Sequence, residues 1–412
     1  MTDTNGNIIV SNCPTEEQLE QIYDILGNVF TVGRSFFKQR QDTNPNYDPA
    51  TTWFAAVNGQ IASTVQIFPM QMQLDSTVIK VGGIGSVGTS DAYQGKGLAS
   101  KILNAQVDYM REQQYDLSML LAVKHGFYER LGWKLITETM YALQNQWTEA
   151  DYVERNEAYN KLQIIPFEHK YISQMKKLHE QFNVNRSGVV VRDDLYWSRL
   201  VTWETWTKQA DCYLLMQDEQ VLAYGIIEGT SNQTYVREFI YDKHDKHAKQ
   251  YAIPFFQELC HKRAGAKMLF ARLPEDHLLY SFFQEKGASS LDLNVAMWKI
   301  TNFDSLMSKL KPLLESRLLA HEQFAKQDLL MHLSCKPYSI YLSYIGGKLE
   351  LTKQASEKLP VIEFDFKEID FIQAMLNGFE TLTNIDVNKI EAELLQALFP
   401  KQLYTFYITD NY

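Results

Sequence analysis

A glycine-rich stretch from Gly82 to Leu103, GGIGSVGTSDAYQGKGLASKIL, constrains the fold of this chain more than any other segment. Its pattern predicts a strand, a short loop and then a helix. Glycine lacks a Cβ atom, so the backbone can turn tightly and come close to a ligand. The helix start presents unpaired N–H groups and the positive end of the helix dipole, which together hold phosphate groups. We therefore expect a pyrophosphate-binding turn between Gln94 and Ala99.

Two other phosphate motifs fit this stretch less well. Gly83 to Gly88 matches the dinucleotide fingerprint G-x-G-x-x-G, but that motif opens a helix directly, and Thr89 to Ala92 has the composition of a loop. A Walker A loop needs G-x-x-x-x-G-K-[ST], and here Lys96 is followed by glycine, which excludes it. A glycine-rich turn without a ligand stays open as an alternative.

Hydrophobic periodicity predicts a mixed α/β unit over the first 143 residues. Asn58-Gly59 is a strong turn signal that joins two strands into a hairpin, and Thr15 to Gln18 has the pattern of a capping box. The expected strands cover 8–10, 53–57, 61–68, 78–89, 117–123 and 134–143, and the expected helices cover 19–30, 36–40, 97–110 and 125–131. Such a mixed sheet carries helices on both faces.

The next part of the chain repeats this pattern in a diverged form. Its expected elements are helices at 171–182 and 250–262 and strands at 212–216, 221–228, 235–241 and 268–273. The segment Phe282 to Ala288 is similar to Phe127 to Trp133, but Phe283 stands where the first copy has Tyr128. No glycine occurs between Gly229 and Gly265, so this copy cannot cradle a pyrophosphate. We interpret it as a scaffold that has lost the chemistry.

The pattern changes again near residue 301. Helices are expected at 302–321, 369–376 and 387–398, and strands at 328–333, 339–345, 348–351 and 403–409, which make a small α+β unit. We therefore predict an α/β and α+β chain of three domains: 1–148, 149–300 and 301–412. A polar, helix-prone stretch at 148–161 is the expected linker between the first two.

Composition excludes several classes of protein. The chain of 412 residues has a net charge of −10, which weighs against nucleic acid as a partner. Its four cysteines show no C-x-x-C spacing and no accompanying histidine cluster, so neither a metal site nor a disulfide framework is expected. The first residues have no signal-peptide pattern, and no apolar run is long enough to cross a membrane. These features predict a cytoplasmic protein.

Two motifs resemble the signature of the GCN5-related N-acetyltransferases. The first is Val87-Gly88-Thr89 followed by Gln94-x-x-Gly97-x-Ala99, which is similar to the acetyl-CoA pattern Q/R-x-x-G-x-G/A. The second is the segment Phe127 to Trp133, FYERLGW. The whole layout resembles the enhanced intracellular survival (Eis) type, with a catalytic domain, a degenerate second one and a sterol-carrier-like third. The resemblance implies acetyl-CoA-dependent acetylation of amines, often aminoglycosides, by a hexamer.

The resemblance also implies a role for particular residues. Val87, Gly88 and Thr89 would hold the pantetheine arm and polarise the thioester carbonyl. The pyrophosphate would be held by the turn and first helical residues, namely Gly95, Lys96, Gly97, Leu98, Ala99 and Ser100. Lys96 is equally well explained as a solvated surface lysine.

Acid and base are assigned in the same way. Tyr128 matches the family's general acid, with a packed aromatic side chain as the alternative. The general base would be the α-carboxylate of Tyr412, and His125 or a water molecule is the fallback. The apolar residues from Leu403 to Ile408 are consistent with a docked tail, although a packed final strand with a frayed end is the competing interpretation.

The acceptor amine is the least determined part of the prediction. Candidate walls of its pocket are aromatic side chains that are equally typical of core packing, namely Phe36, Phe37, Trp53, Trp197, Trp203 and Trp206. The acceptor is expected to be an aminoglycoside, a polyamine or a lysine side chain. Two other functions stay open: a tandem-domain transferase that moves aminoacyl groups from tRNA, and a lipid carrier. Binding of CoA would distinguish an acetyltransferase from both of these alternatives.

Overall fold

The computed structural model describes residues 7–411 apart from 45–46, 145–158, 201–209, 230–231, 263–266, 356–358 and 384. The chain folds into two compact units, and each unit is assembled from separated segments. The first unit comprises the chain up to Thr137 together with Asn294–Gln402. The second comprises Glu138–Leu293 and Leu403–Asn411. The division into three consecutive domains stays a prediction.

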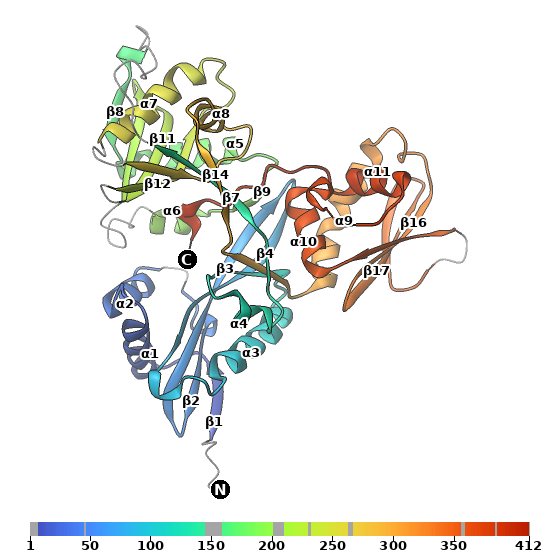
Figure 1. Cartoon of the computed structure of the whole chain (residues 1–412), viewed down its shortest axis with the longest axis horizontal. Helices are drawn as coiled ribbons and strands as arrows, with labels where there is room; N and C mark the ends of the chain where they lie inside the picture. The colour runs from blue at the N-terminus through green and yellow to red at the C-terminus, as the bar shows by residue number, and fades with distance from the viewer. Residues whose placement is uncertain are drawn as a thin grey trace. The chain divides into compact units, whose positions relative to one another are not determined.

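A mixed sheet with helices on both faces forms the centre of the first unit (Figure 1). Its strands, in spatial order, are β1 (Ile8–Asn12), β2 (Thr52–Val57), β3 (Gln60–Leu74), β4 (Thr77–Thr89), β5 (Leu117–Leu121), β15 (Ala296–Ile300) and β6 (Lys134–Leu135). Helices α1 (Glu16–Val29) and α2 (Arg34–Asp42) pack on one face through a cluster that includes Leu26 and Phe54. Helix α3 (Leu98–Glu112) packs on the other face through Ile102 and Leu103.

Local sequence signals account for most of these elements. The Thr15 side chain accepts from the backbone N–H of Gln18, and Gln18 reaches back to the Thr15 N–H, so the predicted capping box is confirmed. Asn58 and Gly59 both have positive φ, at 52° and 84°, which is the backbone that a two-residue hairpin turn between β2 and β3 requires. The mixed α/β fold expected from the sequence is confirmed.

The strand expected at 134–143 is wrong in one respect. The structure divides it into β6 and β7 (Glu138–Gln144), and these two strands belong to different sheets. Strand β15, from much later in the chain, lies between β5 and β6 in the first sheet. Sequence periodicity missed this exchange because alternation describes how one strand is buried and not which partner it pairs with.

The first unit also contains a smaller α+β part. Its sheet has the order β18-β17-β16-β19, formed by β16 (Leu329–Cys335), β17 (Tyr338–Ile345), β18 (Lys348–Thr352) and β19 (Val361–Phe366), and its helices are α9 (Phe303–Ala320), α10 (Glu368–Asn377) and α11 (Lys389–Leu398). Strand β19 was not predicted. The buried carboxylate of Asp116, at the start of β5, accepts from Ser305 and Lys309 of α9 and so joins this part to the first sheet.

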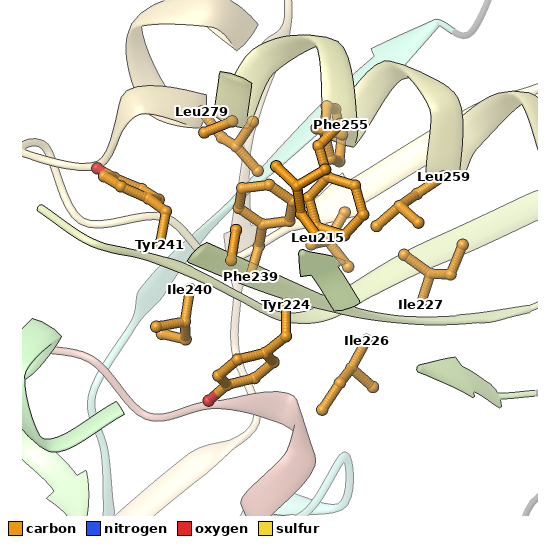
Figure 2. Close-up of a cluster of buried hydrophobic side chains, with 14 of the residues drawn as sticks. Leu215, Tyr224, Ile226, Ile227, Phe239, Ile240, Tyr241, Phe255, Leu259 and Leu279 are labelled. Carbon is orange, nitrogen blue, oxygen red and sulfur yellow. The ribbon is translucent and has the colours of Figure 1, made fainter. Parts of the chain in front are cut away.

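The second unit repeats the strand-and-helix order of the first. Its sheet has the order β14-β7-β13-β12-β11-β10-β8, with β8 (Gln163–Pro166), β10 (Ala210–Gln217), β11 (Gln220–Gly229), β12 (Gln233–Tyr241), β13 (Met268–Ala271) and β14 (Ser289–Leu293). Its helices are α5 (Ile172–Phe182), α6 (Asp194–Leu200), α7 (Ala248–Lys262) and α8 (Leu278–Glu285), and β9 (Ser187–Val190) lies between α5 and α6 in the chain. Figure 2 shows its core, in which Phe239 and Leu215 of the sheet meet Phe255 and Leu259 of α7.

The final strand expected at 403–409 is also wrong. Only Tyr404 forms a β-bridge, to Ser187, and Ile408–Asp410 is a 3₁₀ turn. The tail is nevertheless packed, since the side chains of Phe406, Tyr407 and Asp410 are buried. Side-chain contacts therefore hold this segment where a ladder of backbone hydrogen bonds was expected. Most of the predicted linker at 148–161 lies outside the described residues.

The core of the second unit contains two buried histidines whose protonation is unfavourable. Burial, and next the Arg192 charge, lowers the pKa of His179 from 6.5 to about 3, and burial lowers the pKa of His277 to about 4. Between these values and 6.5 the unfolded chain binds more protons than the folded chain does. Stability therefore falls as the pH falls through this window.

We predict that His179→Phe makes this pH dependence shallower, because the variant no longer takes up that proton on unfolding. Each histidine contributes a slope of at most about 1.4 kcal/mol per pH unit. The measurement is the free energy of unfolding, obtained from denaturant titrations at several pH values between 7 and 4. This is roughly the range in which a perturbed histidine changes its protonation. The exposed His244→Gln variant is the control and should leave the slope unchanged. An unchanged slope in His179→Phe would contradict the assignment.

Candidate active site

Strands β4 and β5 stop pairing after Ile84, in the middle of β4, which opens the sheet of the first unit beyond that point. Their parallel register runs from Val81 opposite Leu117 to Ile84 opposite Leu120. Just beyond this point β4 carries a β-bulge. Gln66 of β3 faces Gly85, and Thr64 faces Gly88, so one residue of β3 lies opposite two residues of β4. Ser86 in the bulge has a φ of +49°. A bulge disrupts the ladder and bends the strand, so backbone groups here can turn toward a ligand.

The predicted phosphate turn has an unusual backbone that only glycine adopts easily. Gly95 and Gly97 have φ values of +74° and +72°, and a Cβ atom on either would meet no other atom within 4 Å. Gly97 is the N-cap of α3 and supplies no side-chain cap. The first amides of the helix, from Leu98 to Ser100, therefore have neither an intrahelical partner nor a capping side chain. Open space beside uncapped amides suits a pyrophosphate.

Lys96 and Gln94 complete the turn. The Lys96 ammonium lies 4.8 Å from the centre of the Tyr93 ring, and Gln94 donates to the Asp91 carboxylate over 2.8 Å. Both side chains are exposed. Lys96 is thus beside the turn, where its charge can add to the helix dipole, and the motif glutamine orders the loop through Asp91.

Gly88 and Thr89 lie on the strand that leads into this turn. A Cβ atom on Gly88 would lie 3.0 Å from Leu26 and 3.3 Å from Ile25, so the packing of α1 leaves little room for a side chain there. The Ser63 hydroxyl donates to the Gly88 carbonyl and lies 2.8 Å from the Thr89 hydroxyl. These bonds fix the end of β4 against β3, and Val87, which precedes Gly88, packs against the hydrophobic cluster under α3.

Tyr128 lies in the short helix α4 (His125–Glu129), which follows β5. Its ring packs edge-on against Phe127, with ring centres 4.9 Å apart, and both rings contact the core under α3. No described residue forms a hydrogen bond with the Tyr128 hydroxyl. Burial raises the pKa of this phenol, so it stays protonated at neutral pH and can act as a proton donor.

The two candidate bases differ in what the structure describes. The Nε2 atom of His125 lies 3.1 Å from the Ala122 carbonyl and 2.8 Å from the Asn294 carbonyl, so it donates to the backbone as part of the fold. Only its Nδ1 atom could accept a proton from a substrate. Tyr412 lies outside the described residues.

Sequence analysis missed an arginine at the bulge of β4. Arg40, near the end of α2, donates to the Ser86 hydroxyl over 2.8 Å, and its guanidinium lies 4.5 Å from the centre of the Phe68 ring. A cation therefore lies beside the bulge. No local signal marks Arg40, because its partner is 46 positions away in the chain.

The aromatic residues predicted to line the acceptor pocket fall into two groups: some lie in the hydrophobic core, and one lies near the bulge of β4. Phe37, Trp53 and Trp197 are buried members of hydrophobic clusters, which supports the core interpretation for them. Phe36 is only half-buried, and the Arg40 guanidinium lies 5.6 Å from the centre of its ring. Trp203 and Trp206 lie outside the described residues.

Comparison with known proteins agrees with this geometry. Residues 13–136 match the sequence model of the family described as an acetyltransferase (GNAT) domain. No curated protein matches the chain.

Solved structures share the fold over nearly the whole length. A probable N-acyltransferase of unknown function from Enterococcus faecalis V583 is 15% identical with a TM-score of 0.71, and the match covers 97% of both chains. A GCN5-related N-acetyltransferase from Anabaena variabilis is 15% identical with a TM-score of 0.70, over 97% of this chain and 98% of the other. Eis1 from Mycobacterium abscessus is 10% identical with a TM-score of 0.63, over 98% and 100%. The similarity extends well beyond the first sheet.

The segment from residue 13 to 136 is a GNAT acetyltransferase domain, and the chain that carries it is an acetyltransferase. Enzymes of this fold use acetyl-CoA and act on amines. Among the described residues no group of three or more His, Cys, Asp or Glu side chains could hold a metal ion. None of the helices in the described part of the chain is long and apolar enough to cross a membrane.

We predict that Gly97→Val abolishes most of the acetyl-CoA affinity, since a side chain in the turn would occupy the space before the helix amides. Gly59→Val is the matched control, because Gly59 also has positive φ and open space around its Cβ position. Both variants should lose about 1–3 kcal/mol of stability from backbone strain. Calorimetric titration with acetyl-CoA should show a Kd raised by about 10-fold or more for Gly97→Val and an unchanged Kd for Gly59→Val. A 10-fold change corresponds to the loss of roughly one charge-assisted hydrogen bond. Retained affinity would contradict the pyrophosphate turn.

Proposed function

We propose that this protein transfers the acetyl group of acetyl-CoA to a primary amine. The expected acceptor is an aminoglycoside, a polyamine or a lysine side chain. The observation that carries the proposal is the combination of the uncapped α3 amides, the open glycine turn and the bulge at the parting of β4 and β5. One end of this arrangement suits a pyrophosphate, and the other presents backbone groups to a thioester.

The residues Val87, Gly88 and Thr89 are proposed to bind the pantetheine arm and to polarise the thioester carbonyl. Acyl transfer builds negative charge on that oxygen, and a fixed N–H donor stabilises it more in the transition state than in the ground state. The bulge and the hydroxyl contacts of Ser63 support this assignment, because they hold the end of β4 in one conformation.

Arg40 adds an electrostatic effect at the same place. An alkylammonium has a pKa of roughly 10, and it must lose a proton before it can attack. A nearby cation disfavours the charged ammonium form of the acceptor. The Arg40 guanidinium beside Ser86 would act in this way on an amine brought to the bulge.

Tyr128 is proposed as the general acid that protonates the departing CoA thiolate. A thiol has a pKa of roughly 8.5, so a phenol can return a proton to it. The raised pKa and the hydroxyl without a hydrogen-bond partner among the described residues support this role.

The general base is proposed to be the α-carboxylate of Tyr412. A terminal carboxylate has a pKa of roughly 3.5, so it needs burial or a relaying water molecule to accept the amine proton. The third part of the chain is proposed to be sterol-carrier-like, the assembly a hexamer and the location cytoplasmic, all on the resemblance to Eis-type enzymes.

The proposal is tested by release of free thiol from acetyl-CoA with a panel of aminoglycosides, polyamines and lysyl peptides. The full chain and a variant without Tyr412 are compared. We expect release by the full chain and its collapse in the truncated chain. Release by both would overturn the role of Tyr412. Absence of acetyl-CoA binding by the full chain would overturn the proposed activity.

We predict that Tyr128→Phe lowers kcat by about 10²-fold or more, because proton transfer by a positioned group contributes about that much. The Kd of acetyl-CoA should be unchanged, since Tyr128 does not belong to the turn. Phe127→Leu is the control for packing, because Phe127 supplies the neighbouring ring and no proton. Equal turnover of Tyr128→Phe and the unaltered enzyme would remove Tyr128 from the role of acid.

A further inference from the structure

The short helix that carries Tyr128 depends on a strand from much later in the chain. Helix α4 joins β5 to β6, and β15 lies between these two strands in the sheet. The helix has only five residues and no side-chain cap at its N-terminus. Such a short helix is not stable by itself, so tertiary contacts must fix its position. The segment around β15 supplies contacts at both of its ends.

At its N-terminal end α4 is bonded to the residues just before β15. The Nε2 atom of His125, the first residue of the helix, lies 2.8 Å from the Asn294 carbonyl. The amide of Ala122, which follows β5 directly, donates to the Val295 carbonyl over 2.9 Å. These two contacts hold the start of α4 beside the start of β15.

At the C-terminal end of α4 the contact is made by Lys299 of β15. Its ammonium donates to the Leu131 carbonyl over 3.1 Å, in the turn that follows the helix. The amides of Leu131 and Trp133 donate to the Tyr128 carbonyl over 3.0 and 3.1 Å, so the turn is bonded directly to the backbone of Tyr128. A cation at the last carbonyls also suits the negative end of the helix dipole.

The turn has room for the Lys299 side chain only because it contains a glycine. Gly132 has a φ of +96°, and a Cβ atom at this position would collide with the Lys299 ammonium. The ammonium also lies 5.4 Å from the centre of the Trp133 ring, which is buried and donates to the Ser118 hydroxyl. Leu131, Gly132 and Trp133, which end the motif FYERLGW, thus all contact one lysine side chain.

The fold keeps this ammonium in place although its burial is unfavourable. Burial lowers the pKa of Lys299, an effect that the charge of Glu368 opposes. Glu368 begins α10 and accepts from the Ile300 amide over 2.6 Å, so it also fixes the end of β15. An apolar side chain at position 299 would fill the same space without the desolvation of a charge. What the lysine adds is a directed N–H bond to the turn after α4.

We propose that Lys299 is a positioning residue for acetyl transfer, because it fixes the turn after α4 and with it the place of Tyr128. Lys299 acts through Tyr128 and does not contact the substrate. The inference rests on the proposed function, in which Tyr128 protonates the departing CoA thiolate. Lys299, α4 and the opening between β4 and β5 all belong to the first unit.

The variant Lys299→Met tests the proposal, because methionine is also long and unbranched but donates no hydrogen bond. Lys80→Met is the matched control. The Lys80 ammonium donates to the Gln113 carbonyl at the end of α3 over 2.9 Å and lies 4.0 Å from the centre of the Tyr115 ring. Each variant removes a lysine that bonds to a carbonyl after a helix and lies over an aromatic ring. Only one of these helices carries Tyr128.

We expect Lys299→Met to lower kcat by about 10-fold, because misplacement of a catalytic group by about 1 Å costs up to about 10²-fold. The KM of acetyl-CoA should stay within about 2-fold, since the glycine turn before α3 is unchanged. Hydrogen exchange of the Leu131 and Trp133 amides should become faster. Lys80→Met should leave kcat and the exchange of these two amides unchanged.

A second comparison separates the positioning of Tyr128 from a general loss of stability. In the Tyr128→Phe background the proton donor is already absent, so adding Lys299→Met should lower kcat by less than about 2-fold more. A lysine that only stabilised the fold would lower kcat by the same factor in both backgrounds.

Three results would overturn the inference. Unchanged exchange of the two amides in Lys299→Met would show that Lys299 does not hold the turn. Faster exchange with unchanged kcat would show that the held turn does not serve transfer. An equal loss of kcat with and without the Tyr128 hydroxyl would show that Lys299 does not act through it. Failure of the proposed function has a different signature, because the unaltered enzyme would then release no thiol with any amine while exchange still reported on the turn.

Discussion

The limited pairing of β4 with β5 is the constraint on which the rest of the site depends. A parallel ladder over the full length of both strands would close the sheet, and no backbone group at its centre could reach a ligand. Here pairing ends at Ile84 and the bulge at Ser86 follows. The glycine turn and the uncapped amides of α3 come next in the chain. The proposed contacts to the phosphates and to the thioester thus both follow from one interruption of one sheet.

The same interruption occurs in both units, and the two copies use it differently. In the first unit the bulge is lined by small residues and the helix after it is preceded by glycines. In the second unit Arg237 and Glu238 stand at the bulge, and the chain's own tail packs against them. Loss of the glycines did not leave an open cleft, because a buried ionic contact took over the region.

Strand β15 explains why the first compact unit is assembled from separated segments, whereas the second unit is discontinuous because of the tail at Leu403–Asn411. Strand β15 completes the first sheet between β5 and β6, and β7 completes the second between β13 and β14. The first sheet therefore depends on a strand from much later in the chain, because β15 pairs with both β5 and β6. A consecutive segment that ended at Thr137 would leave β5 and β6 of the first sheet without the strand that joins them.

Local chemistry determined much of this protein from its sequence. The capping box at Thr15, the Asn58-Gly59 turn and the start of α3 at Gly97 follow from the conformations that these residues allow, and the acetyl-CoA motif predicted the turn that the fold builds. Only the tertiary structure decided the partners of β6 and β7, the contact of Arg40 with Ser86 and the buried ion pairs of Arg192 with Glu238 and Asp410. These contacts join residues 46 or 218 positions apart. Periodicity and motif spacing record how a segment is buried and how it turns, but they do not record which distant residue it meets.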